Sequence, residues 1–280
     1  MSYKRVLTIQ DISCLGQCSG TVALPIISAC GHECCIIPSA VLSTHTGGFT
    51  GYTFTDLTED IPKIREHWEK ENLDFDCIYT GYLGSTKQIE YVAEIFASRL
   101  KSCGVKVVDP AMADNGKLYV VFDENFVEHM KELCRRADII VPNITEACFL
   151  TGTEYKETYD QNYINELLTK LDEMGAHCVV LTGVSYRPEA TGVVVYEDGL
   201  SSYYEHIRVG NGWHGTGDVY ASAFVGALMC GKNAVESAVI AADYTVDCIL
   251  GTKDDESHWY GVKFEAQIPE LLKSLKIVSE

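Results

Sequence analysis

Two glycines around a threonine, followed directly by an aspartate, form the most informative stretch of the sequence. The stretch reads Gly215-Thr216-Gly217-Asp218, and an Ala-rich amphipathic pattern follows from Val219. Glycines let backbone N–H groups converge on one point, and the start of a helix adds partial positive charge. The pattern therefore predicts an anion hole at Gly215, Thr216 and Gly217, with Asp218 beside the bound anion. The alternative is a plain helix cap, worth about 1 kcal/mol.

Two common nucleotide-binding motifs do not fit this sequence. Gly210, Gly212 and Gly215 have the spacing of the dinucleotide fingerprint, which needs a following βαβ unit. Residues 217–251 offer only helical patterns, so we reject a dinucleotide site. The Gly-Lys pairs of the chain lack both the loop and the Ser or Thr of a Walker A motif.

Polar residues also follow the ends of apolar runs, where ligands of open α/β sheets bind. Asp109-Pro110 ends one such run. The pair could simply end a strand, because Pro cannot continue the ladder, but a carboxylate there is costly without a cation, so we favour a metal-binding role for Asp109. Asn143 and Glu146 follow another run, and their spacing is ambiguous because it also forms a capping box. Thr182-Gly183 ends a third.

Short apolar runs alternate with helical stretches along the chain. The expected buried strands are Val6–Gln10, Cys34–Ser39, Cys77–Thr80, Val105–Asp109, Ile139–Pro142 and Cys178–Thr182. The expected helices are Asp56–Glu71, Lys87–Cys103, Glu124–Arg136 and Asn162–Met174, and the chain is almost wholly helical from Thr216. Thr191–Tyr196 and Ser202–Val209 predict a hairpin. This alternation predicts one α/β domain over residues 1–280, with a mostly parallel sheet and helices on both faces.

The charge balance of the 280 residues excludes some partners. The chain has 22 Lys+Arg against 40 Asp+Glu, a formal net charge of -18, which repels nucleic acids and anionic membrane surfaces. A nucleotide site would therefore need local cations or backbone donors. No apolar run reaches the roughly 20 residues of a membrane helix, and the N-terminus lacks a signal-peptide pattern, so we expect a cytoplasmic protein.

Twelve cysteines raise the question of disulfides or metal binding. The tightest cluster runs from Cys30 through His32 to Cys34 and Cys35, and it could supply zinc ligands. The chain has no Cys-x-x-Cys pair. We interpret the cysteines mainly as buried thiols that pack as small apolar residues.

The glycine turn with its aspartate resembles the ribokinase-like superfamily, and further motifs from Val6 to Gly251 are similar to the pyridoxal kinases. The matching segments are Leu7-Thr-Ile-Gln-Asp11, His45-Thr46-Gly47, Thr80-Gly81-Tyr82, Asp109-Pro110 and Pro142-Asn143-Ile-Thr-Glu146. The resemblance implies a three-layer ribokinase-like sandwich. It also implies an enzyme that uses ATP to phosphorylate the 5′-hydroxymethyl group of pyridoxal, pyridoxine or pyridoxamine.

The resemblance assigns roles to the matching residues, with Asp218 as catalytic base. The residues expected to hold the pyridine ring are Asp11, His45, Thr46 and Tyr82. Those expected at the nucleotide are Asp109, Asn143, Glu146, Thr182 and Gly183, of which Asp109 and Glu146 would hold Mg²⁺. Residues 111–120, with Tyr119, have the composition of a flap over the site or of an ordinary surface loop. A monovalent cation such as K⁺ and a homodimer are implied as well.

Two departures from the family pattern limit what can be transferred. Many pyridoxal kinases place Ser at the position of Asp11, and a carboxylate there would favour a cationic ring. The preference among vitamers therefore stays open. The residues Gly212-Trp213-His214 also differ among relatives, so the resemblance assigns no phosphate contact to them.

Three other functions remain as alternatives. A hydroxymethylpyrimidine kinase shares the fold and reaction, but typically opens with a Gly-Ser-Asp-Ser-Gly-Gly-Ala-Gly stretch that is absent after Ile9. An ATP-dependent lyase acting on hydrated nicotinamide cofactor shares the fold but lacks the Thr-Gly-Tyr segment. A silent vitamer-binding protein would not need Asp218 or the paired acids.

Overall fold

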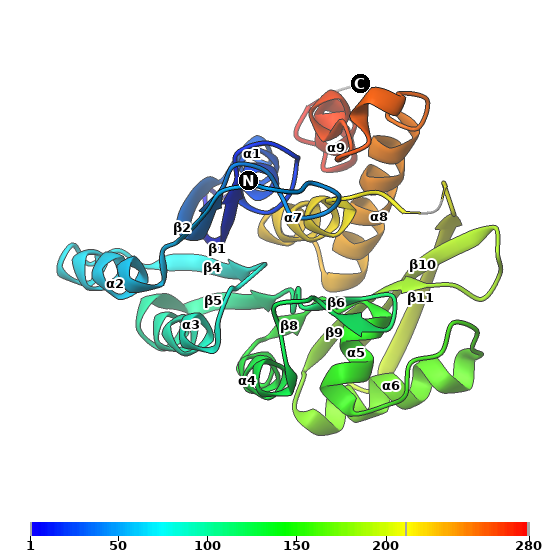
Figure 1. The fold of residues 1–280 in the computed structure, drawn as a ribbon, viewed down its shortest axis with the longest axis horizontal. Helices are drawn as coiled ribbons and strands as arrows, with labels where there is room; N and C mark the ends of the chain where they lie inside the picture. The colour runs from blue at the N-terminus through cyan, green and yellow to red at the C-terminus, as the bar shows by residue number, and fades with distance from the viewer. Residues whose placement is uncertain (1, 211, 279–280) are drawn as a thin grey trace.

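The computed structural model describes residues 2–210 and 212–278, and a nine-stranded sheet runs through them (Figure 1). In sheet order the strands are β11 (Leu200–Ile207), β10 (Ala190–Glu197), β9 (Cys178–Val184), β8 (Ile139–Ile140), β5 (Leu100–Val108), β4 (Phe75–Thr80), β1 (Arg5–Ser13), β2 (Glu33–Leu42) and β3 (Phe54–Asp56). The strands from β9 to β2 pair in parallel, whereas β3, β10 and β11 pair antiparallel. The predicted mostly parallel sheet and the hairpin are confirmed.

Helices cover both faces of the sheet (Figure 1). One face carries α1 (Gly20–Ala29), α7 (Thr216–Met229), α8 (Ala234–Leu250) and α9 (Ile268–Ser274). The other carries α2 (Ile61–Lys70), α3 (Thr86–Arg99), α4 (Glu124–Cys134), α5 (Ile144–Thr151) and α6 (Gln161–Met174). Short 3-10 turns cover Thr58–Asp60, Glu256–His258 and Phe264–Gln267. The molecule is a three-layer α/β sandwich, as predicted.

Each face of the sheet has its own apolar core, which explains the continuous apolar runs in the sequence. Along β1, Val6 packs with the α1 and α7 side, while its neighbour Leu7 packs with the opposite side. Successive strand residues point to opposite faces, so a strand covered on both faces has apolar residues throughout. The buried thiols of Cys30, Cys77 and Cys134 belong to these cores.

Two predicted helix boundaries are wrong, in both cases because residues expected in the helix form a strand instead. The helix expected from Asp56 begins only at Ile61, since Phe54–Asp56 pairs with β2, and Pro62 then lies in its first turn. The helix expected to reach Cys103 ends at Arg99, because Leu100–Val108 forms β5. The helix α1 was not predicted from the sequence, and of α5 only the capping box at its start was.

The segment interpreted as a flap or surface loop contains a small hairpin of β6 (Ala113–Asp114) and β7 (Lys117–Leu118). Its turn residues, Asn115 and Gly116, both have positive φ, as a tight two-residue hairpin requires. Among the described helices, none is both long and apolar enough to cross a membrane.

Candidate active site

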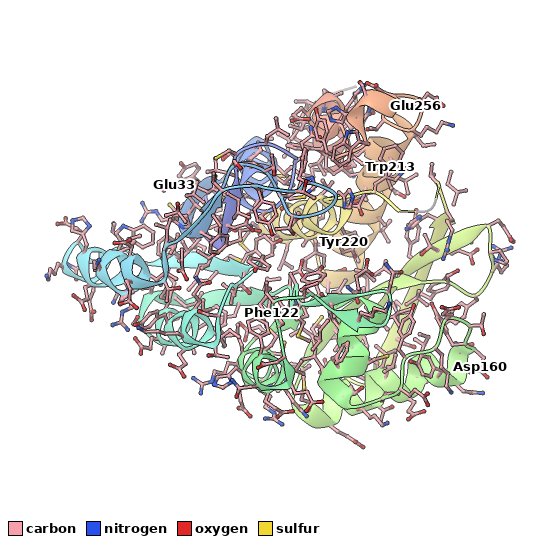
Figure 2. The ribbon with its side chains drawn as sticks, viewed as in Figure 1. Glu33, Phe122, Asp160, Trp213, Tyr220 and Glu256 are labelled. Atoms are coloured by element: carbon pink, nitrogen blue, oxygen red, sulfur yellow. The ribbon has the colours of Figure 1, made fainter. Side chains whose placement is uncertain are left out.

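A cavity of about 450 Å³ lies at the carboxyl ends of the central strands, against the start of α7. Figure 2 labels two of its lining side chains, Trp213 before α7 and Tyr220 within it. The predicted residues that line it are Asp109, Tyr119, Asn143, Glu146, Thr182, Gly183, Gly215, Thr216, Gly217 and Asp218. The fold thus brings the predicted base, anion hole and nucleotide residues to one place.

The start of α7 has the geometry of an anion hole. Gly215 has a φ of 75°, and a Cβ there would lie 2.1 Å from the carbonyl oxygen of Gln17, so only glycine fits. The first backbone hydrogen bond of the helix runs from the Val219 N–H to the Gly215 carbonyl (3.0 Å). The amides of the first turn therefore have no helical acceptor. A Cβ on Gly217 would meet nothing within 4 Å, so this turn faces open space.

The side chain of Asp218 lies in that first turn and is largely buried. Its pKa is raised to about 7, chiefly by burial; the backbone N–H of Ser19 opposes this rise, and the negative charge of Asp11 adds to it. A general base works best with a pKa near the operating pH. The environment of Asp218 suits proton abstraction near neutral pH.

Sequence reasoning missed Ser19, which connects two predicted site residues. Its backbone φ is 55°, a region that non-glycine residues rarely adopt, and the residue is only 6% exposed. Its backbone N–H lowers the pKa of Asp218, and its side chain lowers the pKa of Asp11. Strained residues of this kind cluster at functional sites. No local sequence pattern predicts a serine with a positive φ at this position.

Asp109 and Glu146 form an electrostatically coupled pair of carboxyl groups. Burial raises the pKa of Glu146 to about 7, although its Oε2 accepts from the Asn143 N–H (2.8 Å) and its Oε1 from the Met112 N–H (3.1 Å). Burial, and then the charge of Glu146, holds the pKa of Asp109 well above its usual range. A nearby cation would relieve this repulsion.

This donor set fits Mg²⁺ better than a metal held entirely by protein. Within residues 2–210 and 212–278, no three His, Cys, Asp or Glu side chains are grouped as metal ligands. Mg²⁺ is usually held by one or two carboxylates, with waters and substrate phosphates completing its shell. Asp109 and Glu146 can supply those carboxylates.

Asn143 is the N-cap of α5, so the capping box is confirmed. Its Oδ1 accepts from the Glu146 N–H (2.9 Å), and its Nδ2 donates to the Ala113 carbonyl (2.9 Å). The side-chain amide is thus engaged within the protein. A direct contact with ATP stays a prediction.

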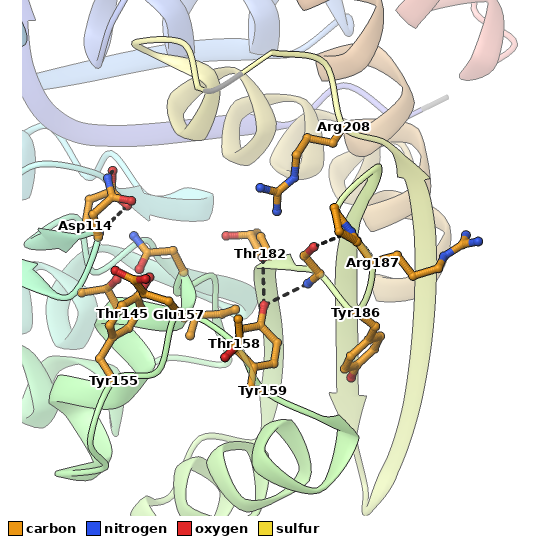
Figure 3. Close-up of a pocket in the computed structure, with 16 residues that line it drawn as sticks. Asp114, Thr145, Tyr155, Glu157, Thr158, Tyr159, Thr182, Tyr186, Arg187 and Arg208 are labelled. Carbon is orange, nitrogen blue, oxygen red and sulfur yellow. Dashed lines mark hydrogen bonds between the residues drawn. The ribbon is translucent and has the colours of Figure 1, made fainter.

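A second cavity of about 420 Å³ adjoins the first (Figure 3). The two share Asp114, Asn143, Thr182 and Gly183. Gly183 has a φ of 74°, and a Cβ there would meet nothing within 4 Å. An elongated ligand could therefore pass from one cavity to the other beside Thr182 and Gly183.

Sequence reasoning also missed Arg208, which points into the second cavity (Figure 3). Its guanidinium has no ion pair or side-chain hydrogen bond within the part of the chain that the structure describes. Arg187 lines the same cavity but points away and pairs with Glu205 and Glu189. Arg208 is a local cation of the kind that, with backbone donors as the alternative, a nucleotide site in this acidic chain was expected to need. Its position shortly before the glycine turn was the only signal in the sequence.

The loop that carries His45-Thr46-Gly47, called the substrate loop below, is anchored by His45, which is 5% exposed. Its Nδ1 accepts from the Gly47 N–H (3.0 Å), so its Nε2 carries the proton and donates to the Tyr260 carbonyl (2.6 Å). Both ring nitrogens are thus used within the protein. Thr46 next to it is exposed. Contact of either residue with a pyridine ring stays a prediction.

Asp11 and Tyr82 lie near the cavity but are not among its lining residues. The buried Asp11 carboxylate accepts from the Ser13 hydroxyl (2.9 Å). Burial, and then the charge of Asp11, raises the pKa of Tyr82 to about 12, while its ring lies 5.6 Å from that of Phe122. The two residues are therefore electrostatic neighbours, as the predicted substrate site requires.

Comparisons with known proteins agree with this geometry. The sequence profile of the phosphomethylpyrimidine kinases matches residues 24–259. The pyridoxal kinase of Dictyostelium discoideum is 28% identical over 239 residues, 79% of this chain and 77% of that protein. A Bacteroides thetaiotaomicron protein assigned to the phosphomethylpyrimidine kinases, crystallised with pyridoxal, is 33% identical with a TM-score of 0.91 and covers 96% of both chains. The Lactobacillus plantarum pyridoxal kinase is 29% identical with a TM-score of 0.90 over 100% of both.

The fold and the site define a ribokinase-like small-molecule kinase. The chain belongs to the phosphomethylpyrimidine kinase family, and pyridoxal kinases are among its relatives. The predicted fold class and enzyme class are confirmed.

Replacing Asn143 tests whether it does more than cap a helix. Asn143→Ala should lower the free energy of unfolding by about 1 kcal/mol through loss of the cap. If Asn143 also binds the nucleotide, the KM for ATP should rise severalfold in steady-state assays. Asn233→Ala is the matched control, since Asn233 forms the same capping box on α8 and does not line either cavity. Equal kinetics of the two variants would leave Asn143 only a structural role.

Proposed function

We propose that the protein transfers the γ-phosphoryl group of ATP to the 5′-hydroxymethyl group of pyridoxal, pyridoxine or pyridoxamine. The observation that carries this proposal is the single cavity that joins the free amides of α7, the Asp218 carboxylate and the Asp109–Glu146 pair. The relative crystallised with pyridoxal supports the substrate class.

In the proposed reaction Asp218 receives the proton of the 5′-hydroxyl as its oxygen attacks the γ-phosphorus. A new O–P bond forms while the bond from the γ-phosphorus to the ADP oxygen breaks. Phosphoryl transfer asks a protein mainly for positioning and charge stabilisation. The amides at Gly215, Thr216 and Gly217 would hold the developing charge, because preorganised donors need no reorganisation during the reaction.

Mg²⁺ would be held by Asp109 and Glu146, directly or through waters, and when bound it neutralises phosphate charge. Tyr119 lines the cavity and is followed by the fully exposed Val120, a placement that supports the flap role. A monovalent cation, a homodimer and a cytoplasmic location remain predictions from the resemblance and the composition.

The nucleotide would run from the first cavity into the second, beside Thr182 and Gly183. Its phosphates would then lie within reach of Arg208, while the tyrosines of the second cavity would face the remainder of the nucleotide. This placement satisfies the requirement for local positive charge in a chain of net charge -18.

A hydroxymethylpyrimidine kinase is the second candidate. The chain belongs to the phosphomethylpyrimidine kinase family, and a Bacillus subtilis hydroxymethylpyrimidine/phosphomethylpyrimidine kinase is 27% identical to it over 222 residues. Both substrates present a hydroxymethyl group on a flat nitrogen heterocycle, so the same base and anion hole would serve either.

Incubation with MgATP tests the proposal directly. Each vitamer and hydroxymethylpyrimidine should be supplied separately and then in pairs, with products followed by mass spectrometry. We expect 5′-phosphates of one or more vitamers at higher kcat/KM than the pyrimidine phosphate. A clear preference for the pyrimidine would overturn the vitamer assignment, and no phosphorylated product from any acceptor would overturn the kinase proposal.

The raised pKa of Asp218 predicts a pH-dependent rate. With a folded-state pKa of about 7, the carboxyl is protonated below pH 7 and cannot accept a proton, so kcat should fall on acidification. Asp218→Asn should lower kcat by roughly 10²–10⁴-fold.

The same substitution should stabilise the fold. In the unfolded chain Asp218 ionises near its ordinary pKa, whereas in the folded protein its pKa is about 7. The buried charge therefore lowers the folding stability progressively as the pH rises from the ordinary pKa, and the full loss is reached above pH 7. The gain in Tm of Asp218→Asn should therefore be larger at pH 8 than at pH 5. Asp254→Asn, a substitution at an exposed position, is the control and should change neither kcat nor Tm. A variant with normal turnover would refute the base assignment.

Arg208→Gln should raise the KM for ATP about tenfold, because a charge-assisted hydrogen bond to phosphate is lost. The vitamer KM should change little. Arg187→Gln removes a guanidinium that is already paired at the same cavity, so its ATP affinity should stay near that of the parent. If the two substitutions raise the KM for ATP equally, the net charge near this cavity, and not a contact of Arg208 with phosphate, sets the affinity for ATP.

A further inference from the structure

The cavity at the start of α7 is strongly acidic. Its lining includes Asp109, Asp114, Glu146 and Asp218, and no Lys or Arg occurs among the described residues that line it. The side chains there that can carry a positive charge are His206 and His214. An anionic phosphoryl group in this cavity would find few side-chain hydrogen-bond donors, and the two histidines are the candidates.

The two histidines differ in their hydrogen bonds. His206 lies in β11, and its Nδ1 is bonded to the Ile207 carbonyl (3.0 Å). His214 directly precedes Gly215, and its ring nitrogens have no hydrogen bond or ion pair within residues 2–210 and 212–278. Of the two, His214 is the imidazole with unused donors, and it adjoins the anion hole.

The substrate loop packs against one side of the His214 ring. A Cβ on Gly47 would lie 2.6 Å from Nδ1 and 2.8 Å from Cε1 of that ring, so only a glycine permits this approach. The His45 ring lies 5.3 Å away, with the two planes at 42°. The loop therefore covers the Nδ1 side, and Nε2 is the ring nitrogen left for a ligand.

We propose that His214 is a further catalytic residue, whose Nε2–H donates a hydrogen bond to the transferring phosphoryl group. This inference rests on the proposed function. The bond would add a side-chain donor to the backbone amides of α7, at a point where the nearby side chains are acidic. No proton leaves the imidazole in this role, so Asp218 remains the base.

Kinetics of His214→Ala and His214→Gln test this role. At saturating ATP and vitamer, His214→Ala should lower kcat about 10- to 100-fold, the effect expected for a lost hydrogen bond to a charged group. The KM for the vitamer and the Kd for ADP should stay within about threefold, because the contact forms with the transferring group. His214→Gln keeps an N–H donor and should recover part of the rate.

Phe49→Ala separates this role from simple support of the substrate loop. Phe49 packs on His45 (5.0 Å) and Trp259 (4.7 Å) and does not line the cavity. Loosening the loop in this way should raise the vitamer KM with little change in kcat. If His214→Ala instead reproduces that pattern, His214 only supports the loop and the proposal is wrong. The Tm of each variant shows whether it is folded.

Binding of ADP with Mg²⁺ and aluminium fluoride, which mimics the transferring phosphoryl group, gives a measurement independent of the acceptor. Calorimetry should show that His214→Ala weakens this complex about tenfold or more and leaves ADP alone unaffected. Equal affinities in the parent and the variant would refute the proposal. If the parent enzyme phosphorylates no acceptor, the proposed function is wrong. The affinity for the aluminium fluoride complex would still decide whether His214 contacts the transferring group.

Discussion

The contact between the loop that follows β1 and the start of α7 is the constraint on which the site depends. The Gln17 carbonyl approaches Gly215 so closely that no side chain fits, and the backbone N–H of Ser19 lowers the pKa of Asp218. Together these contacts fix the helix start and the predicted base in one geometry. Because the Ser19 side chain also lowers the pKa of Asp11, the predicted base and the predicted ring-binding carboxyl group share one neighbour.

Electrostatic repulsion among buried carboxyl groups marks the cavity at the start of α7. Asp109, Glu146 and Asp218 all have raised pKa values, chiefly because they are buried, and each lies near another carboxyl group. Like charges in a dry cavity cost free energy, which a bound cation can offset. The proposed binding of a metal-bound nucleotide would relieve this repulsion. Backbone amides and Arg208 supply positive potential without a lysine in the anion hole.

The predicted substrate side is assembled from segments far apart in the chain. His45 bonds to the Tyr260 carbonyl, and Phe49 packs on Trp259, so a loop near the N-terminus is held by the segment after α8. That segment also reaches the β1 loop, since the His258 ring nitrogen bonds to the Gln17 side chain (2.6 Å). Changes in residues 258–260 would therefore act on the site through these supports, although none of them lines the cavity.

The sequence by itself determined the layered α/β fold, the glycine turn before α7 and the Asn143–Glu146 cap, because each depends on periodicity or on neighbours within a few residues. Strand pairing decided where the helices near Asp56 and Cys103 end, since hydrogen bonds to a distant strand outweigh local helix propensity. The backbone of Ser19, the direction of Arg208 and the bonded nitrogens of His45 likewise emerged only in the tertiary structure. Each is set by residues that are distant in the sequence, and contacts of this kind produce no local sequence pattern.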